Sequence, residues 1–154
     1  MLARLKTLLN GATQPRKDAE DLRTSVAALL VEAAWSADGF GPDERATITR
    51  LLQERFGLAA ADAAQLLDAG DKAGRNTVNM FRFTREVLNG MEAEQRVEMV
   101  EMLWDVAYAD GHLDAEEERL ITKVAGLLYV SPGERNAAKR RAMARANIGS
   151  GSIA

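Results

Sequence analysis

The sequence predicts an all-α fold, a single-domain bundle of about seven helices. Apolar residues recur with the three- and four-residue spacing of amphipathic helices, and alanine and leucine, both strong helix formers, dominate them. No segment sustains the apolar–polar alternation of a strand. Three prolines in 154 residues leave room for long helices between them: Pro15, Pro42 and Pro132.

Glycine and proline mark where the predicted helices begin and end. The first helix runs from Asp18 to Asp38, and the glycines that follow stop it. Pro42 opens the next helix because a first helical turn does not need its N–H, and Gly57 ends that helix. Further helices are predicted at 60–73, 77–89 and 93–110, from 114 onward, and at 132–145.

Two of these helices carry a more specific prediction. Apolar side chains surround most of the circumference of the helix at 77–89, so we expect it to be largely buried. Asp114 precedes Glu117 by three residues, a capping-box pattern with Asp in place of Ser or Thr. We therefore expect Asp114 to begin the helix that follows it.

The composition excludes several classes of protein. A net charge of -3 and a pI near 5.3 argue against nucleic-acid binding by the chain as a whole. The absence of cysteine excludes disulfides and thiolate chemistry and fits a reducing cytoplasm. No apolar run is long enough to span a membrane, and we identify no signal peptide. Catalytic and nucleotide-binding motifs are missing, so we do not expect an enzyme or an organic cofactor.

We divide the chain into a helical domain and two flanking segments. The domain is placed at residues 18–146, because all predicted helical stripes with a clear core face fall there. Residues 1–17 are expected to be flexible or to form a short amphipathic segment, and 147–154 to be a disordered tail.

The strongest organisational signal is an internal repeat. A shift of 72 positions aligns the Ala-Asp-Gly turns at 37–39 and 109–111, and it places Glu44 on Glu116. Each turn lies between two apolar helical stripes, so the shared pattern is helix, A-D-G-x-x-x-x-E, helix. We interpret the chain as two pseudo-repeated helical hairpins.

These two stretches resemble the TerB-like tellurite-resistance family. The clearest is MLWDVAYADGHLDAEEERLITKVAGLLYVS at 102–131, with AAWSADGFGPDERATITRLLQERFGL at 33–58 as its counterpart. The resemblance covers 18–145 and implies a compact helical bundle in a bacterial cytoplasm, with acidic residues suggested to hold a divalent cation. It also implies a non-enzymatic partner in stress-response or membrane-linked complexes. The sequence departs from the family at 41–43, where Gly-Pro-Asp replaces the usual capping residues.

The repeated turns supply the candidate metal ligands. Asp38 and Asp110 each lie at the C-terminal end of a helix, where the helix dipole disfavours a carboxylate. Each is followed six residues later by a glutamate, Glu44 or Glu116, and a cation would offset their repulsion. Oxygen ligands favour Ca²⁺ or Mg²⁺, which takes about six of them. One turn offers too few, so folding would have to bring the two turns together.

Plain helix capping is the alternative explanation for several of these acids. Asp43, Asp114 and Glu117 lie in first helical turns, where negative charge is favourable, so we treat them only as helper ligands. His112, the single histidine, is expected to be solvated. Without cysteine or a second histidine, a zinc site is not expected.

A metal-free docking module is the alternative function. Its acidic turns and a basic last helix would then bind partners electrostatically, and a protein partner is expected under either hypothesis. That helix carries Arg135, Lys139, Arg140, Arg141 and Arg145. The leucines and cations of residues 1–10 leave peripheral membrane contact open, and a homodimer stays open as well.

Overall fold

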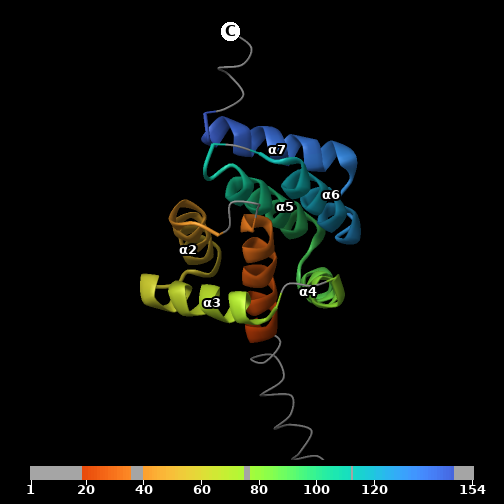
Figure 1. Ribbon diagram of the computed structural model, residues 1–154. Helices are drawn as coiled ribbons and strands as arrows, with labels where there is room; N and C mark the ends of the chain where they lie inside the picture. Colours follow the sequence, from red (N-terminus) through yellow and green to blue (C-terminus); the bar gives the residue numbers. More distant parts are fainter. Residues whose placement is uncertain (1–18, 36–39, 75–76, 112, 148–154) are drawn as a thin grey trace, which may run out of the picture.

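The computed structural model describes residues 19–35, 40–74, 77–111 and 113–147, and within these ranges it contains helices and turns but no strand. The all-α prediction is confirmed. A first helix occupies residues 19–34, and the chain then continues through α2 Pro42–Phe56, α3 Ala60–Lys72, α4 Thr77–Gly90, α5 Ala93–Ala107, α6 Ala115–Leu127 and α7 Pro132–Arg145 (Figure 1). The predictions for residues 1–17 and for the tail beyond 147 lie outside the described residues.

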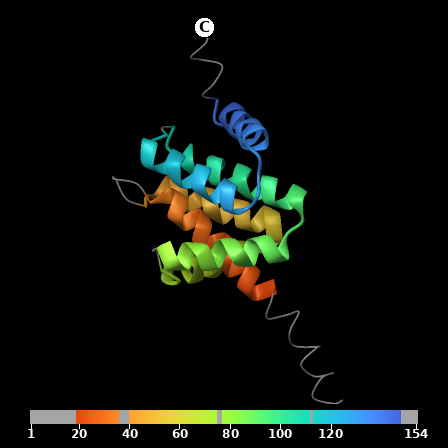
Figure 2. The ribbon, with the colours of Figure 1, turned by 90° about the vertical axis from the view of Figure 1, so that its right-hand side faces the viewer.

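The helices stack in layers around the 19–34 helix. Figure 2 shows α7 above α5 and α6, with α2 and the 19–34 helix beneath them and α3 and α4 at the base. The most extensive contacts between labelled helices join α5 to α7 and α2 to α3. One continuous hydrophobic core results, and its largest fully buried side chains include Leu29, Leu30, Leu52, Leu67, Leu103, Trp104, Ile121 and Leu128.

The helix ends follow the signals in the sequence. Pro42 occupies the first turn of α2, and Gly57 ends that helix in the left-handed conformation with φ 64°. Asp114 caps α6, since its side chain accepts a hydrogen bond from the Glu117 amide at 2.8 Å. α5 ends at Ala107, three residues earlier than predicted, because residues 108–110 form a hydrogen-bonded turn that leads into Gly111 with φ 84°.

The internal repeat is larger than the predicted hairpin and includes a third helix. Shifting α2 and α3 by 72 residues gives 114–128 and 132–144, which closely match the bounds of α6 and α7. The same shift carries the 19–34 helix onto 91–106, close to α5. Two three-helix units are therefore joined by α4, which has no counterpart in the repeat.

In both units the third helix crosses the first through small residues. A Cβ atom at Gly70 of α3 would lie 2.7 Å from the backbone of Ala27 and Ala28, so only glycine permits this approach. The equivalent position in α7 is Ala142, which is buried and lies near α5. Small residues therefore occupy the equivalent positions of α3 and α7.

The prediction that the helix at 77–89 is largely buried is wrong for one of its faces. Met80, Phe83 and Val87 are buried, but Val78 is 77% exposed and Phe81 is 42% exposed. α4 makes a limited contact with α6, and the face that carries Val78 and Phe81 stays exposed. Within the described residues, no helix is both long enough and apolar enough to cross a membrane.

Candidate functional site

The predicted metal ligands differ in their placement. Asp38 and His112 lie outside the described residues. Glu44 is half-buried in the first turn of α2, with its carboxylate close to Gly41: a Cβ there would lie 3.1 Å from Glu44 Oε2. Asp110 and Glu116, in contrast, are both exposed at the surface of the second turn.

The second turn concentrates three carboxyl groups, Asp110, Asp114 and Glu117, which we call the acidic turn cluster. Glu117 is only 7% exposed, although it lies in the first turn of α6. Burial raises the pKa of its carboxyl to about 8, and the charge of Asp114, its hydrogen bond with Asp114 and the charge of Asp110 add to the effect. The cluster therefore holds a buried carboxyl that favours a proton or another positive charge.

Helix geometry explains why Glu117 and not Glu116 faces inward. Glu117 shares a helical face with Ile121, Val124 and Leu128, at spacings of four, seven and eleven residues, and all three are buried. Glu116 lies one position earlier, about 100° away around the helix, and faces solvent. The spacing of Glu117 from these apolar residues is visible in the sequence. The preference for acidic residues in first helical turns, however, already explained a glutamate at this position.

The described carboxylates do not form a complete metal site by themselves. Among the residues that the structure describes, no three Asp, Glu, His or Cys side chains converge as metal ligands. Glu44, Asp110 and Glu116 therefore do not constitute a preformed ligand set. A full set has to include Asp38, or it has to form by movement of side chains when an ion binds.

The middle of α2 and the second acidic turn border the same hollow. It has a volume of about 300 Å³, and Thr47 and Arg50 of α2 face it together with Tyr108, Ala109 and Gly111 of the turn. The middle of α2 therefore lies beside the turn at 108–111. Side chains of α5 and α7, including Asp105 and Arg145, complete the lining.

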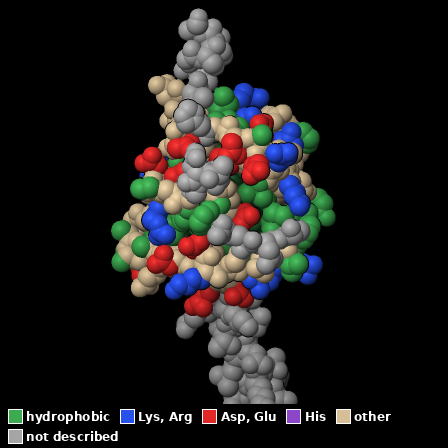
Figure 3. Space-filling model, viewed as in Figure 1, with side chains coloured by type: hydrophobic (Ala, Val, Ile, Leu, Met, Phe, Trp, Pro, Cys, Tyr) green, Lys and Arg blue, Asp and Glu red, His purple; other side chains and the backbone are tan. Residues whose placement is uncertain are grey.

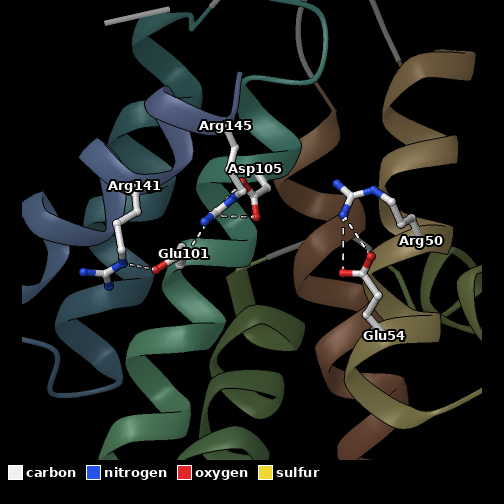
Figure 4. Close-up of polar contacts among 6 residues, drawn as sticks. All are labelled: Arg50, Glu54, Glu101, Asp105, Arg141 and Arg145. Atoms are coloured by element: carbon white, nitrogen blue, oxygen red, sulfur yellow. Dashed lines mark hydrogen bonds and ion pairs between the residues drawn. The ribbon is translucent and has the colours of Figure 1, made fainter. Parts of the chain in front are cut away.

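Several basic side chains of α7 form ion pairs with other helices of the chain. Arg145 donates three hydrogen bonds to Asp105, at 2.9, 3.0 and 3.1 Å, and it also lies 2.6 Å from Glu101 (Figure 4). Arg141 bonds the other oxygen of Glu101 at 2.5 Å, and Lys139 bonds Glu118 on α6 at 2.9 Å. Three of the five basic residues predicted to bind partners thus tie α7 to α5 and α6.

A second hollow, of about 390 Å³, lies between α2 and α5 beside this network. Three arginines line it, and each has a carboxylate partner: Arg50 with Glu54 at 3.3 Å, Arg55 with Glu98 at 3.3 Å, and Arg145 with Glu101. An anionic ligand would have to displace these carboxylates. Figure 3 likewise shows acidic, basic and apolar side chains interspersed over this face of the molecule.

The family model described as tellurite resistance protein TerB matches residues 23–140. The chain belongs to the TerB family. The match covers most of both repeat units and the whole of the acidic turn cluster, and it confirms the resemblance drawn from the two A-D-G turns. No curated protein and no solved structure matches the chain.

Proposed function

We propose that this TerB-family chain is a non-enzymatic accessory protein that binds a divalent cation through its acidic turns. In this proposal it acts in a bacterial cytoplasm, in tellurite resistance or a related stress response. The ion orders the turns, and the charged surface around them contacts a partner protein.

The observation that carries the proposal is the burial of Glu117 against Asp114, with Asp110 close enough to perturb it. A carboxylate buried beside two others is unfavourable unless something positive compensates it. An ion held by carboxylate and backbone oxygens supplies that compensation, and these ligands suit Ca²⁺ or Mg²⁺. In this proposal Asp38, Glu44, Asp110 and Glu116 are the ligands, with Asp43, Asp114 and Glu117 as helpers.

In the docking alternative, fewer basic side chains of α7 are free to bind a partner than the sequence suggests. Lys139, Arg141 and Arg145 form internal ion pairs, so the basic helix offers a partner less free charge than its sequence suggests. A metal-free module would therefore rely mainly on the exposed carboxylates of the turns, including Asp110 and Glu116.

Thermal unfolding in EDTA, followed by excess Ca²⁺ or Mg²⁺, tests the proposal. An ion at about 100 times its Kd adds about 2.7 kcal/mol to the free energy of unfolding, and the midpoint rises accordingly. Asp110→Asn is expected to abolish most of this rise while the helical content is kept.

Asp62→Asn is the matched control, because Asp62 lies in the first turn of α3 and lines a hollow with Glu20 and Arg23, near the start of the 19–34 helix. Its response to the ions should equal that of the parent protein. A parent midpoint that does not change between EDTA and excess ions would reject cation binding and leave the docking alternative.

A further inference from the structure

α4 carries an exposed stripe that combines apolar and basic side chains. Val78, Phe81 and Arg85 follow one another at spacings of three and four residues, so they lie on one side of the helix. Val78 is 77% exposed and Phe81 is 42% exposed, and Arg85 is exposed as well. The opposite side of α4 contains the buried Met80 and Val87, so the exposed stripe does not contribute to the core.

α6 extends this stripe into a broader surface. Lys123 of α6 lies over the Phe81 ring, with Nζ 5.6 Å from the ring centroid, and Arg119 lies one turn earlier on the same side of α6. Both cations are exposed. Figure 2 shows α4 and α6 side by side on the face turned to the viewer, with no described helix in front of them. We call Val78, Phe81, Arg85, Arg119 and Lys123 the α4–α6 face.

The cations of this face are not paired with carboxylates in the described part of the chain. None of the ion pairs between described residues includes Arg85, Arg119 or Lys123. Glu86 is the only acid of α4, and it lines a hollow with Asp21 on the side toward the first helix. The α4–α6 face is therefore locally basic, although the whole chain has a net charge of -3.

One exposed acid of α6 borders the face. Glu116 lies seven residues before Lys123, two helical turns away on nearly the same side, and Arg119 lies between them. Glu118 lies on a different side of α6 and is paired with Lys139. On these two helices the face thus presents three cations and borders a single exposed carboxylate.

We propose that the α4–α6 face binds the surface of a lipid bilayer that contains anionic lipids. In this arrangement α4 lies flat on the bilayer, with Val78 and Phe81 in the headgroup region. Arg85, Arg119 and Lys123 contact the lipid phosphates, and each cation near such a surface strengthens binding about fivefold. Because the face has only three cations and two apolar side chains, the binding is weak and reversible.

The shape of the face favours lipid over an acidic segment of a partner protein. The hollows beside α4 are lined by other side chains of the helix, including Met80, Phe83 and Glu86. Val78 and Phe81, in contrast, are exposed on its outer side. A protein partner usually places its apolar anchors in well-packed pockets, whereas a fluid bilayer adapts to a convex surface.

Co-sedimentation of the full chain with lipid vesicles tests this proposal. The vesicles contain phosphatidylcholine alone or an equal mixture with phosphatidylglycerol, and EDTA keeps the result independent of cation binding at the acidic turns. The parent protein should bind the mixed vesicles at least about tenfold more tightly than the neutral ones, and added salt should weaken this binding. Arg85→Glu should lower the partition coefficient at least about tenfold, and Val78→Ser should lower it as well. Both side chains are exposed, so both variants should keep the parental helical content.

Arg140→Glu is the matched control, because it changes the net charge equally at an exposed position of α7. Its binding to the mixed vesicles should equal that of the parent. The proposal is overturned if the parent does not bind the mixed vesicles, or if Arg85→Glu binds them as tightly as the parent does. The second result would assign the contact to another segment, such as the leucines and cations of residues 1–10.

A polarity-sensitive dye locates the contact, because the chain has no cysteine and a single one can be introduced for labelling. The dye is attached to Val78→Cys or, as the control, to Arg140→Cys. On the mixed vesicles its emission should shift to shorter wavelength at position 78 and stay unchanged at position 140. An equal shift at both positions, or a shift at position 140 alone, would overturn the proposal.

Discussion

At the scale of single residues, adjacent glutamates in α6 have opposite environments. Glu117 is buried beside Asp114, whereas Glu116 faces solvent one position away. The difference follows from the rotation of about 100° per residue along a helix. It makes Glu117 the residue whose protonation affects the stability of the fold most directly.

In EDTA the free energy of unfolding should fall as the pH rises from about 4.5 to about 8. The folded protein raises the pKa of Glu117 from its usual value to about 8, so it binds this proton more tightly than the unfolded chain does. The stabilisation is therefore complete below the unfolded pKa and is lost as the pH rises through the folded one. Its slope is at most about 1.4 kcal/mol per pH unit.

Glu117→Gln supplies the test of this pH dependence, because glutamine keeps the size of the side chain and cannot ionise. Denaturant unfolding of both proteins across this pH interval should show a flatter profile for Glu117→Gln, which should be the more stable protein at high pH. The matched control, Glu116→Gln, should keep the parental profile, since Glu116 is exposed. Parallel profiles for Glu117→Gln and the parent would contradict this account of the cluster.

At the scale of elements, the crossing of α3 over the 19–34 helix depends on one missing side chain. Gly70→Ala places a Cβ 2.7 Å from the backbone of Ala27, and backbone cannot move aside as a flexible side chain can. We expect the free energy of unfolding to fall by about 1–3 kcal/mol. Chemical denaturation followed by circular dichroism measures this change.

Gly133→Ala in α7 is the opposite case, since a Cβ at Gly133 meets nothing within 4 Å. It should leave the stability unchanged or raise it by up to about 1 kcal/mol. Equal effects of the two substitutions would show that the crossing is not constrained by contact at Gly70.

The attachment of α7 to α5 depends on Arg145. Asp105 and Glu101 are only 11% and 18% exposed, and Arg145 bonds both. Burial raises the pKa of Asp105 even beside this arginine, so its carboxylate is poorly solvated. Arg145→Ala should therefore lower the free energy of unfolding by about 1–3 kcal/mol.

Arg50→Ala tests whether that loss is specific to the α5–α7 network. Both side chains of the Arg50–Glu54 pair in Figure 4 are exposed, and both residues belong to α2. Removing the pair should therefore lower the free energy of unfolding by about 0.5 kcal/mol or less. The comparison uses the urea midpoints of the two variants. If Arg50→Ala lowered the free energy of unfolding more than Arg145→Ala does, the more important ion pair would be the one on α2.

At the scale of the whole molecule, the sequence predicted the repeat only in part. Helical periodicity and the signals at Pro42, Gly57 and Asp114 predicted most helix boundaries, because local geometry determines where helices start and stop. The third helix of each unit was not recognised as part of the repeat. α3 and α7 share little of their residue pattern beyond small residues at the equivalent positions Gly70 and Ala142.

The candidate site was predictable in its location but not in its internal arrangement. The two A-D-G turns directed attention to Asp110, which lies close enough to Glu117 to perturb its pKa. Which glutamate faces inward depends on the packing of α6, and whether Glu44 approaches Asp110 depends on how the two units dock. Contacts between distant segments of this kind have no signature in local sequence.

The central claim is that the acidic turns hold a divalent cation. Isothermal titration calorimetry of the full chain with Ca²⁺ and with Mg²⁺, after dialysis against EDTA, tests it most directly. The account predicts saturable binding of at least one of these ions, strongly weakened by Asp38→Asn and by Asp110→Asn and unchanged by Asp62→Asn. Titrations of the parent protein that show no saturable binding of either ion, up to millimolar concentration, would contradict it.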